Sequence, residues 1–104
     1  MAQTETKTRS AKQTTFYAVA YDIPEDKRRT KVHKLLKGFG KWTEFSLFEC
    51  FLTKKELLML QNKLEKHLDA KCDRVRIYSL CEKCVEKIET VGIPEPKEDT
   101  VYLI

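Results

Sequence analysis

A single carboxylate followed by a run of cations is the feature of this sequence that most directly suggests chemistry. Asp22 ends an unbroken apolar run, and five cationic side chains follow it: Lys27, Arg28, Arg29, Lys31 and Lys34. Clustered Lys and Arg bind phosphate groups. A carboxylate beside them is typical of a Mg²⁺ site, because Mg²⁺ takes oxygen ligands and bridges to phosphate oxygens. The structural alternative is a turn residue before a solvated helix.

One carboxylate is a poor metal site by itself. In a two-fold homodimer whose first strands end at the symmetry axis, two copies of Asp22 converge and supply the second carboxylate. If the protein is such a homodimer, Asp22 binds Mg²⁺ or another divalent cation and the cations that follow it hold a nucleic acid.

The cysteines give a second, weaker indication of a metal. The stretch from Cys81 to Cys84, Cys-Glu-Lys-Cys, has the spacing of half a structural zinc site, and Cys50 and Cys72 are available to complete it. No His lies at the usual distance. We expect free, structural thiols, with the pair from Cys81 to Cys84 in a turn between two strands.

Other residue types are expected to be structural. Ser46 and Ser79 have no nearby His-Asp partners, so covalent catalysis is not expected. His33 falls at a surface-like position of a predicted helix, where solvated histidines are commonest. The aromatic residues that could stack on bases are more readily explained as core, namely Tyr17, Tyr21, Phe45 and Phe48.

Length and composition limit the class of protein. The chain has 104 residues with 41% hydrophobic content, enough for one domain with a modest core. No segment approaches the roughly 20 apolar residues of a membrane helix, and the amino-terminal residues lack a secretory apolar region, so a cytoplasmic protein is expected. Residues 1–41 carry ten Lys/Arg against four Asp/Glu, whereas residues 42–104 carry ten against twelve. Such a basic segment favours phosphate-rich partners.

The order of apolar periods predicts the elements. Residues 1–14 are polar and are predicted to be a disordered tail. A strand is predicted over 16–21, and an amphipathic helix follows with apolar residues at 32, 35, 36 and 39 and glycines at 38 and 40 that end it. Residues 42–52 are predicted to form one strand. A capping box at Thr53 and Glu56 then begins a second helix with leucines at 57, 60, 64 and 68.

The last part of the chain completes a sheet. Residues 73–80 alternate basic and apolar side chains, and a fourth strand is predicted over 86–91. This β-α-β-α-β-β order fits an α+β, ferredoxin-like two-layer sandwich over 15–92, with an antiparallel sheet and two helices on one face. Residues 93–104 are predicted to be a linker and an apolar strand that pairs with the partner subunit.

Taken together, these motifs resemble the CRISPR-associated protein 2 family over about residues 16–104. The resemblance rests on Tyr21-Asp22 ending the first strand, on the basic start of the helix, on Phe45-Ser46-Leu47-Phe48-Glu49-Cys50, and on Arg76-Ile77-Tyr78 followed by Leu80-Cys81-Glu82-Lys83-Cys84. Two positions depart from the family pattern. Lys41-Trp42 stands where many members have an arginine, and Lys31 replaces a frequent Arg.

The resemblance implies a ferredoxin-like homodimer whose paired aspartates face a divalent cation, cleavage of RNA or DNA in some members, and association with the CRISPR integrase. Transferred to this sequence, Asp22 is the metal ligand and Arg29 and Lys31 lie near the phosphate. The residues that flank the site are Tyr21, Ser46 and Phe48. Two functions follow as hypotheses: a metal-dependent endonuclease acting in spacer acquisition, or a non-catalytic scaffold that holds RNA or double-stranded DNA and bridges integrase subunits.

Overall fold

The computed structural model describes residues 13–92. The predicted carboxyl-terminal linker and strand, 93–104, and all but the last two residues of the predicted amino-terminal tail lie outside the described residues.

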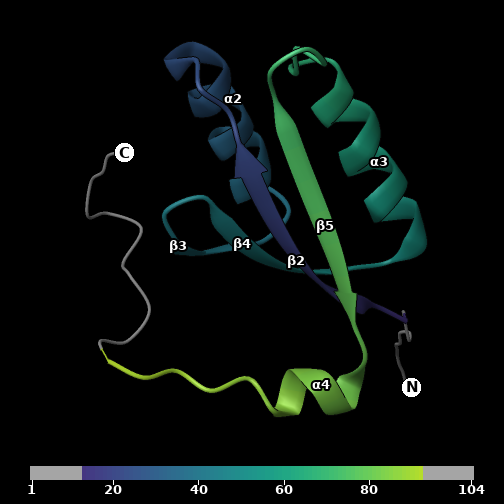
Figure 1. The fold of residues 1–104 in the computed structure, drawn as a ribbon. Helices are drawn as coiled ribbons and strands as arrows, with labels where there is room; N and C mark the ends of the chain where they lie inside the picture. The colour runs from purple at the N-terminus through teal and green to yellow at the C-terminus, as the bar shows by residue number, and fades with distance from the viewer. Residues whose placement is uncertain (1–12, 93–104) are drawn as a thin grey trace.

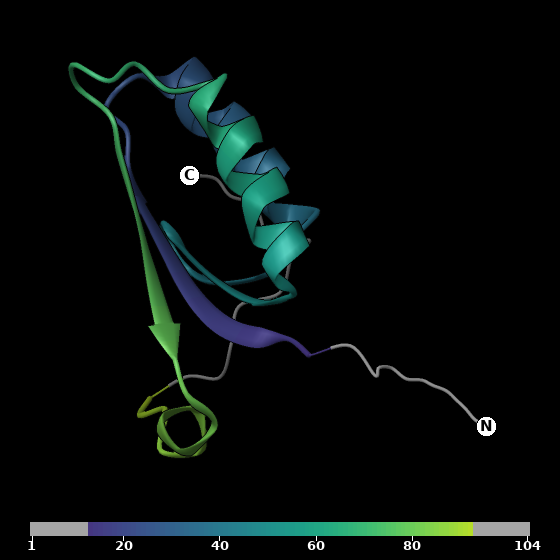
Figure 2. The same ribbon diagram turned by 90° about the vertical axis from the view of Figure 1, so that its right-hand side faces the viewer.

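Four antiparallel strands form one sheet and two long helices cover one of its faces (Figures 1 and 2). The strands are β2 (Thr15–Asp22), β3 (Lys41–Glu44), β4 (Leu47–Leu52) and β5 (Arg74–Leu80), and the helices are α2 (Asp26–Lys37), α3 (Lys54–Glu65) and the short α4 (Glu82–Glu86). The sheet order is β3-β4-β2-β5, with β2 paired to both β4 and β5. This arrangement confirms the predicted α+β, ferredoxin-like sandwich.

The predicted order of elements was wrong in two places. The segment 42–52 is a hairpin rather than one strand, because a two-residue turn at Phe45 and Ser46 separates β3 from β4. The predicted strand over 86–91 does not form. Instead, Cys81 precedes α4, so the cysteine pair begins a helix rather than a turn between strands. The observed order is therefore β-α-β-β-α-β, followed by α4.

A close backbone approach fixes the connection from α2 to β3. Gly40 lies so near β4 that an added Cβ would stand 2.6 Å from the carbonyl oxygen of Glu49 and 2.3 Å from the sulfur of Cys50. Real Cβ atoms do not approach backbone this closely. The glycine is therefore needed here for space, in addition to ending the helical pattern.

The capping box predicted for the second helix is confirmed. Thr53 Oγ1 accepts a hydrogen bond from the Glu56 N–H at 3.2 Å, and Glu56 Oε1 accepts one from the Thr53 N–H at 2.8 Å. Leu60 and Leu64 are buried from this helix, as their spacing predicted.

The core lies between the helices and the sheet, where the largest fully buried side chains are Phe48, Leu36 and Leu60. Within residues 13–92, no helix covers the opposite face of the sheet along most of its length, and this is called the uncovered face below (Figure 2). At one end α4 contacts β2 and β5. There Phe16 is only 5% exposed, and its ring packs edge-on against that of Phe51.

Candidate functional site

Asp22 is exposed at the carboxyl end of β2. Side chains alternate across the sheet, so Asp22 projects to the uncovered face while its neighbour Tyr21 enters the core. Arg74 of β5 lies opposite Asp22 in the register, and Arg76 lies opposite Ala20 on the same face. The Asp22 carboxylate makes no hydrogen bond or ion pair with any of the residues that the structure describes. A carboxylate available to a ligand thus stands beside cationic side chains on the sheet face.

Tyr21 supports this strand end from inside the core. Its hydroxyl lies 3.0 Å from Nδ1 of His33 and 3.5 Å from the carbonyl oxygen of Phe45. Burial raises the pKa of Tyr21, and the charge of Arg29 offsets part of that rise. His33 is half-buried and its ring packs edge-on against Trp42 and Phe48, so its predicted solvated position was wrong.

Ser46 and Phe48 also act through the backbone and the core. The carbonyl oxygen of Ser46 accepts the Tyr21 N–H at 3.0 Å, which joins the hairpin turn to the strand end. Phe48 is fully buried and belongs to the core. Sequence reasoning expected both residues to flank Asp22. In the structure Ser46 contacts the strand end through its backbone and Phe48 packs in the core.

Phe45, by contrast, was expected in the core and is 83% exposed. Its φ of 31° is positive, a conformation that is unfavourable for an aromatic residue. The Trp42 indole N–H donates to the carbonyl oxygen of Phe45 at 2.8 Å and holds this turn. The exposed ring therefore stands at the hairpin that contacts Tyr21.

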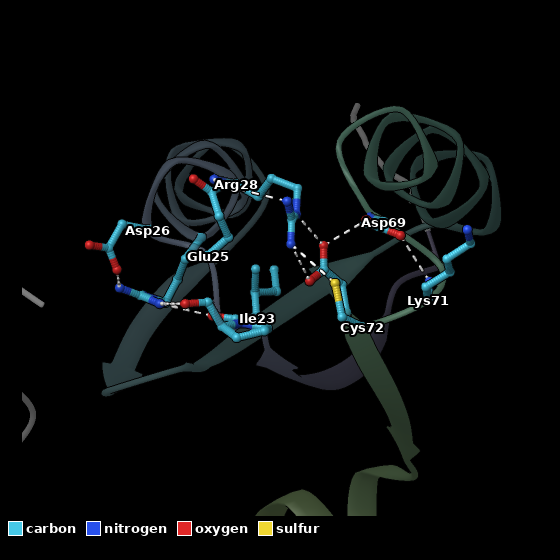
Figure 3. A network of polar contacts seen from close by, with 10 residues as sticks. Ile23, Glu25, Asp26, Arg28, Asp69, Lys71 and Cys72 are labelled. Atoms are coloured by element: carbon cyan, nitrogen blue, oxygen red, sulfur yellow. Dashed lines mark hydrogen bonds and ion pairs between the residues drawn. The ribbon is translucent and has the colours of Figure 1, made fainter.

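Arg28 binds the loop before β5 and is only partly exposed. Its Nε and Nη2 donate to the Asp73 carboxylate at 2.7 and 3.1 Å, and Nη2 also lies 3.3 Å from the sulfur of Cys72 (Figure 3). The Asp69 N–H donates to the same carboxylate at 2.8 Å. Hydrogen bonds from Arg28 lower the pKa of Asp73, and Asp73 in turn raises the pKa of Arg28.

Arg29 is also engaged within the chain. Its Nη1 donates to the carbonyl oxygens of Ile23 and Pro24 at 2.8 and 3.3 Å, and its Nη2 pairs with Asp26. These contacts fix the loop that directly follows Asp22. Arg29 therefore positions the strand end, whereas Lys31 and Lys34 are exposed on α2.

The five predicted cations do not form one surface with Asp22. Lys27, Lys31 and Lys34 recur at i, i+4 and i+7 and share the outer side of α2, in the helical layer. Arg74 and Arg76 lie on the uncovered face of the sheet, where Asp22 also projects. The structure thus separates a helix stripe, Lys27, Lys31 and Lys34, from a sheet-face pair, Arg74 and Arg76.

Comparison with known proteins identifies the family. Residues 15–88 match CRISPR associated protein Cas2. The chain belongs to the Cas2 family. A relative named CRISPR-associated endoribonuclease Cas2 1, from Synechocystis, is 43% identical over 92 residues and covers 85% of this chain and 98% of its own length. A relative from Thermus thermophilus named CRISPR-associated endonuclease Cas2 2 is 42% identical over 82 residues, covering 79% and 90%.

Solved structures agree with membership of the Cas2 family. The crystal structure of Cas2 from Streptococcus pyogenes aligns with a TM-score of 0.67 at 30% identity, covering 74% of this chain and 99% of that one. The crystal structure of the hypothetical protein TT1823 from Thermus thermophilus aligns with a TM-score of 0.72 at 37% identity, covering 80% of this chain and 96% of that one. No helix among residues 13–92 is long and apolar enough to cross a membrane.

The donor set at this end of the Cas2 fold fits a hard cation only in part. Carboxylate oxygen is a suitable ligand for Mg²⁺. Across residues 13–92, however, no three His, Cys, Asp or Glu side chains gather where one ion could be held. Asp22 therefore offers one suitable carboxylate, and the described residues do not supply a full set of ligands around it.

Sequence reasoning missed three features of the site. Asp73 gave no indication that it would pair with Arg28, because the two are 45 residues apart. The position of His33 in the helical pattern predicted a surface residue, yet Trp42 and Phe48 of the hairpin pack against its ring. Arg74 and Arg76 were recognised as an exposed cationic face by their alternation, but only the strand order places them beside Asp22.

Proposed function

We propose that this chain is a homodimeric CRISPR adaptation protein that acts with the CRISPR integrase and cleaves phosphodiester bonds in RNA or DNA, with Asp22 as the metal-binding and catalytic residue. The observation that carries the proposal is the position of Asp22: an exposed carboxylate at a strand end, on the sheet face that also carries Arg74 and Arg76. Family membership supports it, because relatives are named endoribonucleases and endonucleases.

The uncovered sheet face is the surface on which a second subunit would bring its Asp22 close. Ala18 and Ala20 lie on this face of β2 and are small and half-buried, which permits close approach, while Phe51 and Tyr78 expose apolar area around them. A two-fold axis through this face presents each Asp22 to the other.

In this proposal the residues of the candidate site have distinct roles. The two Asp22 carboxylates would hold the cation. When bound, Mg²⁺ polarises phosphate oxygens and lowers the pKa of a bound water. Arg74 and Arg76 contact the phosphate backbone from the same face, and Arg29 holds the loop after Asp22 in place through the carbonyl oxygens of Ile23 and Pro24.

The second candidate is a non-catalytic scaffold in the same assembly. The helix stripe favours it, because Lys27, Lys31 and Lys34 form an exposed row away from Asp22 and suit the backbone of a duplex without any chemistry. Both candidates require the dimer, so they differ only in whether Asp22 contributes to turnover.

The decisive experiment compares Asp22→Asn with wild type on labelled RNA and duplex DNA, with Mg²⁺ and with chelator. We expect wild-type cleavage only with the divalent cation and a loss of at least a hundredfold in Asp22→Asn, while light scattering still reports a dimer. Glu65→Gln, which removes an exposed carboxylate at the end of α3, is the matched control and retains activity. Wild-type cleavage by Asp22→Asn would reject the nuclease; cleavage by neither protein, with binding intact in both, would favour the scaffold.

A further inference from the structure

Two thiols lie close together outside the candidate site. The sulfur atoms of Cys81 and Cys84 are 3.5 Å apart, and both residues are exposed. Cys81 directly follows β5 and Cys84 lies within the first turn of α4. The pair is therefore accessible to small reagents and is already in mutual contact.

The local backbone suits a covalent bond between them. Residues three apart at the start of a helix have Cα atoms about 5 Å apart, which falls within the roughly 4.4–6.8 Å range of disulfides. Rotation of the two side chains brings the sulfur atoms from their separation of 3.5 Å to the bonded length of about 2.05 Å. No large displacement of α4 is needed.

The two thiols are chemically unequal. The backbone N–H and the thiol of Cys84 favour a thiolate at Cys81 and lower the pKa of Cys81. The hydrogen bond between the two side chains raises the pKa of Cys84. One sulfur is thus suited to attack and the other to resolve the product.

The remaining cysteines lack these features. Burial raises the pKa of Cys50 to about 11, and the Cys50 side chain is enclosed in the core. Cys72 is exposed, but desolvation and the charges of Asp69 and Asp73 raise its pKa. Cys72 contacts Arg28 rather than another thiol. Cys50 and Cys72 therefore serve as internal controls for the reactivity of the Cys81 and Cys84 thiols.

We propose that Cys81 and Cys84 form a redox-active dithiol that is converted reversibly to an intramolecular disulfide by exchange with a low-molecular-mass disulfide. The Cys81 thiolate attacks one sulfur of that disulfide, its S–S bond breaks, and the first small thiolate leaves. The Cys84 thiolate then attacks the Cys81 sulfur and displaces the second. Two protein thiols are oxidised, the small disulfide is reduced to two thiols, and the protons lost by Cys81 and Cys84 are taken up by the two leaving groups.

This inference is independent of the nuclease and scaffold functions. α4 contacts β2 and β5 at the end of the sheet where Phe16 is buried, and it connects the sheet to the chain beyond residue 92. A disulfide that spans three residues constrains the unfolded chain little, so the expected effect is local to the start of α4 rather than a large rise in melting temperature.

The test equilibrates the whole protein with graded ratios of oxidised and reduced glutathione, quenches with acid and counts free thiols by mass spectrometry after alkylation. We expect a two-electron transition in which the peptide containing Cys81 and Cys84 loses both thiols together. Cys72→Ser leaves the transition unchanged. Cys84→Ser accumulates a mixed disulfide with glutathione at Cys81, because the resolving thiol is absent.

Alkylation rates at pH 7 give a second readout that does not require the disulfide. A lower thiol pKa raises the thiolate fraction at pH 7, so we expect Cys81 to react with iodoacetamide faster than Cys72. Equal rates at Cys81 and Cys72 would overturn the proposal, as would a peptide that keeps both thiols in fully oxidised glutathione. Stoichiometric zinc bound through these two thiols in protein purified without chelator would also overturn it.

Discussion

Arg28 of α2 and Asp73, which precedes β5, are joined by two hydrogen bonds of 2.7 and 3.1 Å across 45 residues of sequence. The Asp73 side chain is 0% exposed, so its carboxylate is enclosed by Arg28 and the Asp69 N–H. Arg28 therefore ties α2 to the loop that precedes β5. Sequence reasoning assigned Arg28 to phosphate binding, whereas in the structure Arg28 stabilises the fold through Asp73.

Removing the Asp73 carboxylate is expected to destabilise the protein. In Asp73→Asn one amide replaces the bidentate carboxylate, and the Arg28 guanidinium keeps only the longer ion pair with Glu25 at 3.6 Å. Thermal unfolding followed by circular dichroism measures the effect. Asp26→Asn is the matched control, because it also removes an Arg partner but at an exposed position; we expect a clearly smaller loss there.

The Arg28–Asp73 contact also makes stability depend on acid pH. The folded pKa of Asp73 lies below its ordinary value, so its contribution is fully present above the ordinary pKa near 4 and is lost as pH falls through the folded pKa. We expect wild type to lose stability on acidification below about pH 4 and Asp73→Asn to lose less over the same range. Parallel curves for the two proteins would show that Asp73 does not contribute this dependence.

The hydroxyl of Tyr21 is expected to stabilise the strand end that carries Asp22. Tyr21→Phe removes the contacts with His33 and with the carbonyl oxygen of Phe45, and we expect a loss of about 1 kcal/mol in the free energy of unfolding. Because burial raises the folded pKa of Tyr21, its contribution is present below pH 10 and is lost as pH rises through the folded pKa. Tyr21→Phe should therefore be less sensitive to alkaline pH. Tyr17→Phe controls for the loss of a phenol, because no hydrogen bond joins the Tyr17 hydroxyl to the rest of residues 13–92, and it should change stability by less than about 0.5 kcal/mol.

The fold class was predictable because apolar periodicity records which face of each element is buried. The stripe of Leu60 and Leu64 and the capping box at Thr53 specified α3 from the sequence alone. The hairpin was missed because its turn contains Phe45 and Ser46, with neither Gly nor Pro. The Trp42 indole stabilises that turn through a tertiary hydrogen bond, which periodicity does not record.

The positions of Asp22 and of the exposed lysines on α2 were predictable, but the partners of the arginines were not. An apolar run that ends in a carboxylate places it at a strand end, and the structure agrees. The partners of Arg28 and Arg29 were not predictable, because a cation in sequence has the same appearance whether it contacts Asp73, the carbonyl oxygen of Ile23 or solvent. The sheet order, which brings Arg74 opposite Asp22, likewise depends on the whole topology.

Gly40 is expected to tolerate no side chain. A Cβ there would overlap the backbone of β4, so Gly40→Ala should lower the free energy of unfolding by about 1–3 kcal/mol or more. Gly38→Ala is a matched control two residues away, since its Cβ would stand 3.4 Å from the Leu35 carbonyl oxygen and its φ of −78° suits alanine. Chemical denaturation of both variants measures the difference. Equal stability of the two would mean that β3 and β4 shift freely at this point.

The salt dependence of duplex binding is expected to identify which cations contact phosphate. Each phosphate contact contributes about 0.9 to the slope of log affinity against log salt, so Lys31→Gln with Lys34→Gln should reduce that slope by about two. Arg28→Gln should instead lower the melting temperature, because Arg28 is engaged with Asp73.

Two further double variants make this last measurement decisive. Lys54→Gln with Lys55→Gln removes two exposed cations from the start of α3 and controls for net charge; its slope should match wild type. Arg74→Gln with Arg76→Gln tests the sheet face beside Asp22. Suppose the Lys31 and Lys34 variant keeps the wild-type slope while the Arg74 and Arg76 variant loses two units. The duplex would then lie on the sheet face rather than on α2, and the helix stripe would have no part in holding it.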